Sequence, residues 1–305
     1  MSLHPDRLLD RRRLKRGVTI WRALAILAII AVVVVAVGRF AIDGSGGRDH
    51  VSRLWVNGII VDDPERDDVL NEIADDGSSR ALIVRIDSPG GTVVGAESLF
   101  LTLRRIAEHK PVVAVLGTTA ASGGYWVALG ADHIVARRGS ITGSIGVIYQ
   151  TAEISELLDD LGISTEAIRS GPLKARPSPL EPMDEAVRKV TQTVVDDLHD
   201  QFESLVADRR EIDRVKVSSL ADGRVYSGRQ AFAANLVDEL GGEAEARAWL
   251  ERQHGVSADL RVRDVSYGDG RGIVARLGSR ISGALLPDSL GLDGLVAVWH
   301  PDLAQ

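Results

Sequence analysis

Short apolar runs alternate with amphipathic stretches through the part of the chain that follows residue 51. Runs rich in Val, Ile and Leu predict strands at residues 52–61, 81–87, 111–117 and 133–136. Between them, apolar residues at helical spacing predict helices at residues 64–74, 93–109 and 125–129. Because strands and helices alternate, we expect an α/β domain whose functional loops follow the carboxyl ends of the strands.

The pattern continues with shorter elements. We expect strands or strand-like pieces at 139–149, 163–168 and 260–265, helices at 153–161, 182–210 and 243–254, and an irregular Pro- and Gly-rich loop at 170–179. Residues 223–242 predict a strand or turn and then a helix that begins at Ser227, and residues 272–299 predict one or two short apolar helices. The apolar stripe of 182–210 indicates core packing or a subunit contact.

The N-terminal region has a different pattern. Residues 1–22 are basic, and residues 23–38 then form an apolar run without a polar side chain, so we expect a membrane anchor over 23–42 and a flexible linker over 43–51. The alternative is a cleavable signal peptide that ends at residues 36–38. The positive-inside rule predicts a cytoplasmic N-terminus and an exported body, that is, a single-pass protein of the bacterial inner membrane with a periplasmic or extracytoplasmic catalytic domain.

Composition narrows the classes of function. The chain has 305 residues, 45% of them hydrophobic, which is enough for a substantial core. Its net charge of -7, with no long basic face after the N-terminal segment, argues against a nucleic-acid-binding protein. The chain has no cysteine and its 7 histidines show no metal-ligand spacing, so we expect neither a thiol nucleophile nor a metal or other cofactor.

Residues 118–132, TTAASGGYWVALGAD, resemble an active-site segment. They follow a predicted buried strand and place Ser122 before Gly123 and Gly124 at the start of a helix. A serine at such a junction has its hydroxyl at a helix N-terminus, which suits a nucleophile. The alternative is that Ser122 is an N-cap and the two glycines form a tight turn.

The loop DSPGG at 87–91 has similar chemistry. Read alone it is a turn signal, but the amides of Gly90 and Gly91 could form an oxyanion hole together with that of Gly123. Neither His133, soon after Ser122 at a strand start, nor His199, inside a long helix, suits a catalytic base.

Lys174 lies in the loop 170–179. A loop lysine is usually solvated, but a lysine whose pKa is lowered by burial or by a nearby cation such as Arg176 can take a proton from a serine.

Six motifs in one order resemble the signal peptide peptidase family, the S49 serine proteases, in its short single-domain form. They are DSPGG (87–91), AASGGYW (120–126), GADHIVA (130–136), SITGSIGV (140–147), SGPLK (170–174) and GRVYSGRQAFAANLVDELGG (223–242). We therefore expect a peptidase domain at 52–255, followed by a tail at 256–305 in which no motif of the family is found. Leu173 and Ala175 differ from the aromatic and acidic residues that often flank the lysine in the family.

The resemblance implies a Ser/Lys dyad, with Ser122 as nucleophile, Lys174 as general base and Ser144 as the residue that orients the lysine. It also implies the ClpP/crotonase fold of repeated ββα units and a ring-shaped homo-oligomer in which adjacent protomers can supply Ser and Lys. The implied substrates are membrane-derived peptides, notably remnant signal peptides. Two alternatives are a crotonase-like acyl-CoA enzyme and an inactive membrane scaffold of the same fold.

Overall fold

The computed structural model of the protein describes residues 21–22, 25–30, 48–267 and 295–298. The chain forms two units, Met1–Arg48 and Asp49–Gln305. In the first unit, residues 21–22 and 25–30 are helical, and the rest of the predicted anchor at 23–42 lies outside the described residues. Within the described ranges, no helix is both long enough and apolar enough to cross a membrane.

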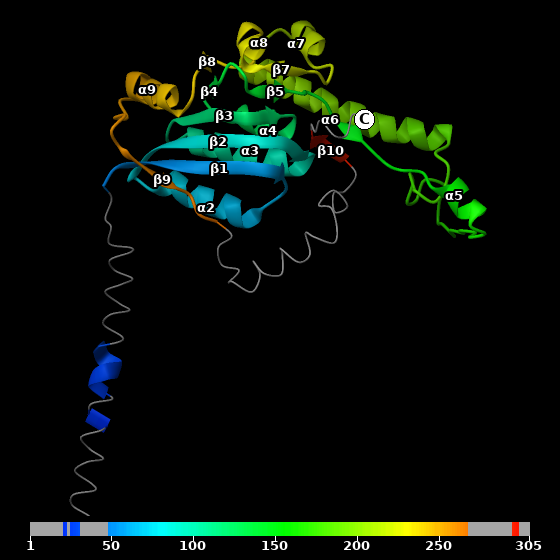
Figure 1. Ribbon diagram of the computed structural model, residues 1–305, viewed down its shortest axis with the longest axis horizontal. Coiled ribbons are helices and arrows are strands. Elements are labelled where there is room, and N and C mark those ends of the chain that lie inside the picture. The colour runs from blue at the N-terminus through cyan, green and yellow to red at the C-terminus, as the bar shows by residue number, and fades with distance from the viewer. Residues whose placement is uncertain (1–20, 23–24, 31–47, 268–294, 299–305) are drawn as a thin grey trace, which may run out of the picture. The chain divides into compact units, whose positions relative to one another are not determined.

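The second unit is built on one mixed sheet, to which the described residues contribute 10 strands (Figure 1). The strands are β1 (His50–Ile60), β2 (Ser79–Thr92), β3 (Val112–Ala121), β4 (His133–Ala136), β5 (Ile141–Gly143), β6 (Ile148–Tyr149), β7 (Val225–Ser227), β8 (Glu239–Leu240), β9 (Arg261–Asp264) and β10 (Leu295–Val298). The main path runs β6-β10-β2-β3-β4-β8, and β1 also pairs with β2 and β9, while β5 pairs with β3 and β7. The pairs of β10 with β2 and β6 and of β5 with β7 are antiparallel, and the others are parallel.

Side-chain alternation along the central strands divides the core into two layers. Along β2, Leu82, Val84 and Ile86 belong to the larger cluster, whereas Ala81 and Ile83 belong to the smaller one. Successive side chains of a strand point to opposite faces, so an apolar run without alternation buries both faces of the sheet.

Helices cover both faces. They are α2 (Pro64–Asp75), α3 (Val93–Ala107), α4 (Gly123–Ala128), α5 (Ser155–Asp160), α6 (Glu185–Arg210), α7 (Arg214–Leu220), α8 (Gly228–Ala233) and α9 (Glu243–His254). Residues of α2, α3, α4, α6, α7 and α8 pack in the larger cluster, and Ala246 and Leu250 of α9 pack in the smaller one. The fold is therefore α/β, as the alternating pattern predicts.

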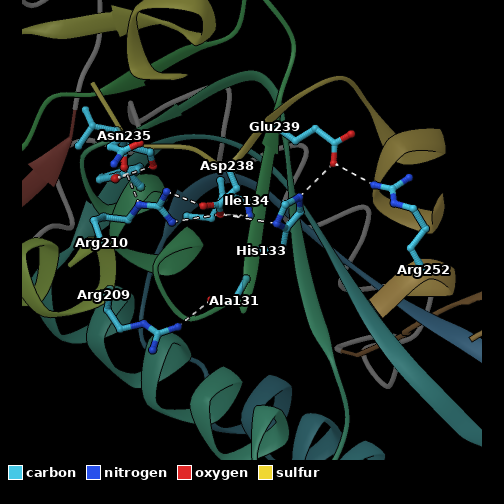
Figure 2. Close-up of polar contacts among 11 residues, drawn as sticks. Ala131, His133, Ile134, Arg209, Arg210, Asn235, Asp238, Glu239 and Arg252 are labelled. Carbon is cyan, nitrogen blue, oxygen red and sulfur yellow. Dashed lines mark hydrogen bonds and ion pairs between the residues drawn. The ribbon is translucent and has the colours of Figure 1, made fainter. Parts of the chain in front are cut away.

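The carboxyl end of α6 is fixed against the sheet (Figure 2). Arg210 donates to both carboxylate oxygens of Asp238, at 3.1 and 2.6 Å, and Asp238 also accepts the Ile134 N–H at 2.8 Å. Arg209 donates to the backbone oxygens of Leu129 and Ala131. The amino end of this 26-residue helix extends beyond the sheet, and α5 lies near that end (Figure 1).

The structure corrects several predicted elements. Residues 163–168 form no strand, and α7 was not predicted. The predicted strand-like piece at 139–149 is two short strands, β5 and β6. Most of 272–299 lies outside the described residues, but 295–298 is the strand β10 and not a helix.

Candidate active site

Ser122 connects the end of β3 to the start of α4. Its backbone has φ 54° and ψ -119°, and it occupies the N-cap position without making a side-chain capping hydrogen bond. A positive φ in a residue other than glycine is strained and persists only where its surroundings enforce it. Here the Ser122 N–H donates to Gly143 O at 2.8 Å. Ser122 is buried, and capping of α4 does not explain its conformation.

Ser144 lies beside Ser122 at the same edge of the sheet. The parallel pairing of β3 with β5 ends at Ala121 and Gly143, so the two serines are the residues that directly follow paired strand ends. Ser144 also has a positive φ, 49°, and its N–H donates to Arg224 O at 2.8 Å. The structure therefore brings two of the predicted site residues together.

A bulge in β3 precedes Ser122. Ile86 pairs with Leu116 and Ser88 pairs with Ala120, so three residues of β3 face Asp87 alone. The Asp87 carboxylate fills this irregularity by accepting the Thr119 N–H at 3.0 Å. The bulge re-aims the end of β3, a frequent use of bulges beside active sites.

The glycine loop packs against the first turn of α4. A Cβ on Gly124 would lie 2.9 Å from Ser88 O, and one on Gly91 would lie 1.8 Å from Ile60 O. Side chains at either position would separate segments that touch through their backbones. The Gly90 N–H donates to Ser88 Oγ at 3.0 Å, and Gly91 pairs with Ile60 of β1 and with Ala297 of β10.

The helix α4 supplies the positive end of its backbone to this region. N–H groups in the first turn of a helix have no partner within the helix, which applies to Gly123 and Gly124. Tyr125 fixes the helix to the segment before β8, because its hydroxyl donates to Leu236 O at 2.8 Å. Burial raises the pKa of Tyr125 above its ordinary value. The Tyr125 hydroxyl is therefore neutral and serves packing rather than proton transfer.

Lys174 is exposed, in the irregular segment between α5 and α6. This segment is held to its neighbours by a bond from the Ile154 N–H to Pro179 O and by ion pairs from Arg176 to Glu181 and Asp184. Asp184 in turn caps α6 by accepting the Val187 N–H. Lys174 thus lies in a segment that is attached to the start of α6, the helix end that extends beyond the sheet.

Within one chain, the segment of Lys174 and the site of Ser144 lie beside different parts of α6. Ser144 shares a cavity of about 380 Å³ with Val195 and His199 of this helix. Gln192 of α6 lines the same cavity, so at about 1.5 Å per residue the eight to fifteen residues from Asp184 to Gln192 and His199 correspond to roughly 12 to 22 Å. The contacts of the segment that carries Lys174 are with α5 and the start of α6, and among the described residues no hydrogen bond joins Lys174 to Ser122 or Ser144.

Neither of the two histidines that the sequence argues against as catalytic bases contacts Ser122. His133 pairs with Val113 near the amino end of β3, the end opposite to Ser122, where its ring stacks on Trp249 and lies 3.2 Å from Glu239 Oε2 (Figure 2). His199 lines the cavity beside Ser144 and lies 3.3 Å from Glu203 Oε1. His133 therefore belongs to the packing of α9, while His199 is nearer to the site than its place in a long helix suggested.

The strand β10 lies directly beside the glycine loop. Val298 pairs with Gly90, Ala297 with Gly91 and Val296 with Thr92, and the other edge of β10 pairs with β6. Both pairings are antiparallel. The edges of β2 and β6 at this point therefore accept an extended chain between them.

Two buried hydroxyl groups of the site were not singled out by the sequence pattern. Ser88 lies in the turn signal DSPGG and Thr142 in the motif SITGSIGV, yet Ser88 Oγ contacts Gly58 and Gly90, and Thr142 Oγ1 donates to Ala120 O at 2.6 Å. The motifs DSPGG and SITGSIGV contained them, but no spacing rule distinguishes such a hydroxyl from an ordinary turn residue.

Comparison with known proteins gives matches to one family of peptidases. Residues 104–257 match the model of peptidase family S49. A putative protease of Synechocystis sp. is 38% identical over 80% of this chain and 89% of its own length. A putative signal peptide peptidase SppA of Enterococcus faecium is 33% identical over 67% of this chain, but the match covers 63% of that relative.

Protease 4 of Haemophilus influenzae is 33% identical over 65% of this chain, and the match covers 32% of its length. Among solved structures, a point mutant of ClpP1 from Listeria monocytogenes aligns over 62% of this chain and 91% of its own, with 14% identity and a TM-score of 0.40.

Proposed function

Since this chain belongs to peptidase family S49 and is a serine-type peptidase, we propose that Ser122 is its nucleophile and Lys174 its general base. The observation that carries the proposal is the backbone of Ser122, which is held at φ 54° beside the first turn of α4 while its side chain makes no capping hydrogen bond. A strained serine at a strand-to-helix junction is the usual setting of a nucleophilic hydroxyl.

The proposed reaction is acyl transfer. Ser122 Oγ attacks the peptide carbonyl, and the neutral amine of Lys174 accepts the hydroxyl proton and returns it to the leaving amine. Water then hydrolyses the acyl-enzyme ester with the same base. The amides of Gly123 and Gly91 hold the oxyanion, because the Gly90 N–H is already bonded to Ser88 Oγ. Ser144, next to Ser122, orients the lysine.

The substrate is proposed to bind as an extended strand between β2 and β6. The pairing of β10 with both strands supports this, because it uses backbone groups and requires no particular side chain. Such a groove suits peptides of variable sequence. Remnant signal peptides, released into the membrane after preprotein processing, are the substrates that we propose.

Lys174 is proposed to act on Ser122 of a neighbouring protomer in a ring-shaped homo-oligomer with the ClpP/crotonase fold. The separation along α6 supports this, and so does the apolar surface of the region around α5 and the start of α6. The exposed apolar residues there are Ile154, Leu157, Leu161, Ile163, Ile168, Leu173, Leu180, Val190 and Val194. Monomeric proteins rarely leave so many apolar side chains exposed in one region.

The membrane anchor remains part of the proposal. A basic segment at 1–22 followed by the apolar run of 23–38 supports a cytoplasmic N-terminus and an extracytoplasmic peptidase domain in the bacterial inner membrane. In that location the enzyme would meet membrane-derived peptides directly.

The test uses purified full-length protein, a quenched-fluorescence peptide with the apolar stretch of a signal peptide, and a fluorophosphonate probe. Wild-type protein is expected to hydrolyse the peptide and to be labelled, whereas Ser122→Ala does neither and Lys174→Ala loses hydrolysis. Hydrolysis by Ser122→Ala at the wild-type rate would overturn the proposal. A wild-type protein without labelling points to the acyl-CoA enzyme if acyl-CoA raises its melting temperature, and otherwise to the inactive scaffold.

A mixture of the two inactive variants tests the shared site. After dissociation and reassembly in equal amounts, about a quarter of the sites in a symmetric ring combine an intact Ser122 with an intact Lys174 of the neighbour. Recovery of activity on mixing is expected, and its absence in a mixed oligomer would mean that both residues act within one chain.

A further inference from the structure

Ser88 is a fully buried serine at the centre of the glycine loop. Its side chain is 0% exposed, and its Oγ donates to Gly58 O at 2.6 Å while accepting the Gly90 N–H at 3.0 Å. A hydroxyl with one proton and two lone pairs satisfies both contacts at once. Ser88 therefore ties the end of β1 to the glycine loop in the last part of β2.

Both backbone partners of Ser88 have unusual conformations. Gly58 has φ 69° and Gly90 has φ 118°, a region that side chains rarely adopt. The dihedral angles of Gly90 set the orientation of the next peptide group, which carries the Gly91 N–H. Because Ser88 Oγ holds the Gly90 amide, it also fixes the direction of the Gly91 amide.

The backbone of Ser88 also packs against the helix that follows Ser122. A Cβ on Gly124 would lie 2.9 Å from Ser88 O. The backbone of Ser88 therefore packs against the first turn of α4 at Gly124, two positions after Ser122. On the other side, Ser88 pairs with Ala120 of β3. One buried residue thus contacts the glycine loop, the strand before the nucleophile and the helix after it.

We infer that Ser88 is a positioning residue for the oxyanion hole: its hydroxyl removes the Gly90 N–H from the site and aims the Gly91 N–H at the substrate oxyanion. The inference deepens the proposed function and rests on it. Ser88 contacts no substrate atom, and it acts through the two glycines that follow it.

The expected effect of Ser88→Ala follows from this role. With the hydroxyl absent, the Gly90 amide loses its partner and the loop is free to rotate. A misdirected oxyanion donor weakens the transition state more than the bound substrate, so we expect kcat to fall about 10- to 100-fold with little change in KM. The rate of fluorophosphonate labelling should fall with kcat, because phosphonylation of Ser122 uses the same donors.

Ser79→Ala is the matched control. Ser79 is a buried serine on the same strand, and its Oγ bonds to Ser52 Oγ at 2.7 Å, but it lies at the opposite end of β2. If the hydroxyl of Ser88 were only structural, the two variants would lose comparable melting temperature and comparable activity. We expect instead that kcat falls in Ser88→Ala alone.

A Ser88→Cys variant extends the test. The thiol is a weaker donor and acceptor of similar shape, so kcat should lie between those of wild type and Ser88→Ala. If Ser88→Ala does not fold, the split between kcat and KM in Ser88→Cys decides the question. A kcat of Ser88→Ala within twofold of Ser79→Ala, or a rise in KM alone, overturns the inference. Activity in Ser122→Ala would instead overturn the proposed function itself.

Discussion

Ser122 and Ser144 directly follow the ends of two paired parallel strands, and both have a positive φ, 54° and 49°. Each is fixed through its backbone: the Ser122 N–H bonds to Gly143 O, and the Ser144 N–H bonds to Arg224 O, both at 2.8 Å. The backbone therefore sets where both hydroxyl groups lie before any substrate or neighbouring subunit arrives. Such preorganisation is what an acyl-transfer site requires.

Removal of the Ser144 hydroxyl should reduce the rate of catalysis and leave the proposed homo-oligomer assembled. We predict that Ser144→Gly lowers kcat about 10- to 100-fold, because Lys174 would lose the group that is proposed to orient its amine. Glycine is the better first substitution, since it tolerates the φ of 49° at this position. Steady-state kinetics on the signal-peptide substrate measure the effect.

Ser144→Ala serves as the companion variant, because it also lacks the hydroxyl but retains a Cβ. If the hydroxyl matters, both variants lose activity. Loss in Ser144→Ala together with full activity in Ser144→Gly would show that backbone strain, and not the hydroxyl, limits the reaction.

Gly91→Ala should inactivate the protein. A Cβ at this position would lie 1.8 Å from Ile60 O, so β1 or the glycine loop has to move and the proposed oxyanion donor moves with it. Gly77→Ala is the control, since a Cβ on Gly77 meets nothing within 4 Å. Hydrolysis and fluorophosphonate labelling should both disappear in Gly91→Ala and stay at the wild-type level in Gly77→Ala. Labelling of Gly91→Ala at the wild-type rate would contradict this role of the loop.

Elements of the fold that have clear local sequence patterns are predicted correctly. The strand at 133–136 and the helix at 243–254 were predicted with the bounds that the structure has, because each is a short apolar or amphipathic segment between clear breakers. The strand predicted at 163–168 is wrong: the side chains of Ile163 and Ile168 are exposed, and no neighbouring strand is present among the described residues. Pattern alone does not reveal whether a partner exists.

For the candidate site, the sequence predicts which loops meet but not the contacts of individual side chains. The positions of Ser122 and the glycine loop follow from strand ends that meet at one edge of the sheet, which the sequence order allows one to expect, whereas a site role for Ser144 is implied only by the family resemblance. The hydroxyl contacts of Ser88 and Thr142 depend on register shifts and bulges, which no residue pattern specifies. The position of Lys174 depends on α6 extending beyond the sheet, a consequence of long-range packing at Arg209 and Arg210.

The attachment of α6 to the sheet should depend on Arg210. This side chain is mostly buried and donates to Asp238 at 2.6 and 3.1 Å, and Asp238 also holds the Ile134 N–H (Figure 2). Arg210→Ala leaves a partly buried carboxylate without its cation, so we predict a loss of about 2 kcal/mol in the free energy of unfolding. Denaturant unfolding at neutral pH measures this loss.

Arg224→Ala is the control for that measurement. Arg224 also pairs with a carboxylate, that of Asp222, but both groups are exposed, and exposed pairs contribute little to stability. We expect no measurable change for Arg224→Ala. Equal losses in the two variants would mean that the contact of Arg210 with Asp238 has no special role in holding α6.

The strand β10 should compete with substrate for the glycine loop. Its residues 296–298 pair with residues 90–92 of β2, the segment on which an extended substrate is proposed to bind. Deletion of residues 295–305 is therefore expected to lower KM and leave kcat unchanged, because the groove no longer has to be vacated before substrate binds. Ala297→Pro should act in the same direction, since proline removes a ladder N–H from a strand that is paired on both edges, whereas Ala297→Val keeps the N–H and should behave as wild type. The same KM in all three variants and the wild type would show that β10 does not occupy the groove that substrates use.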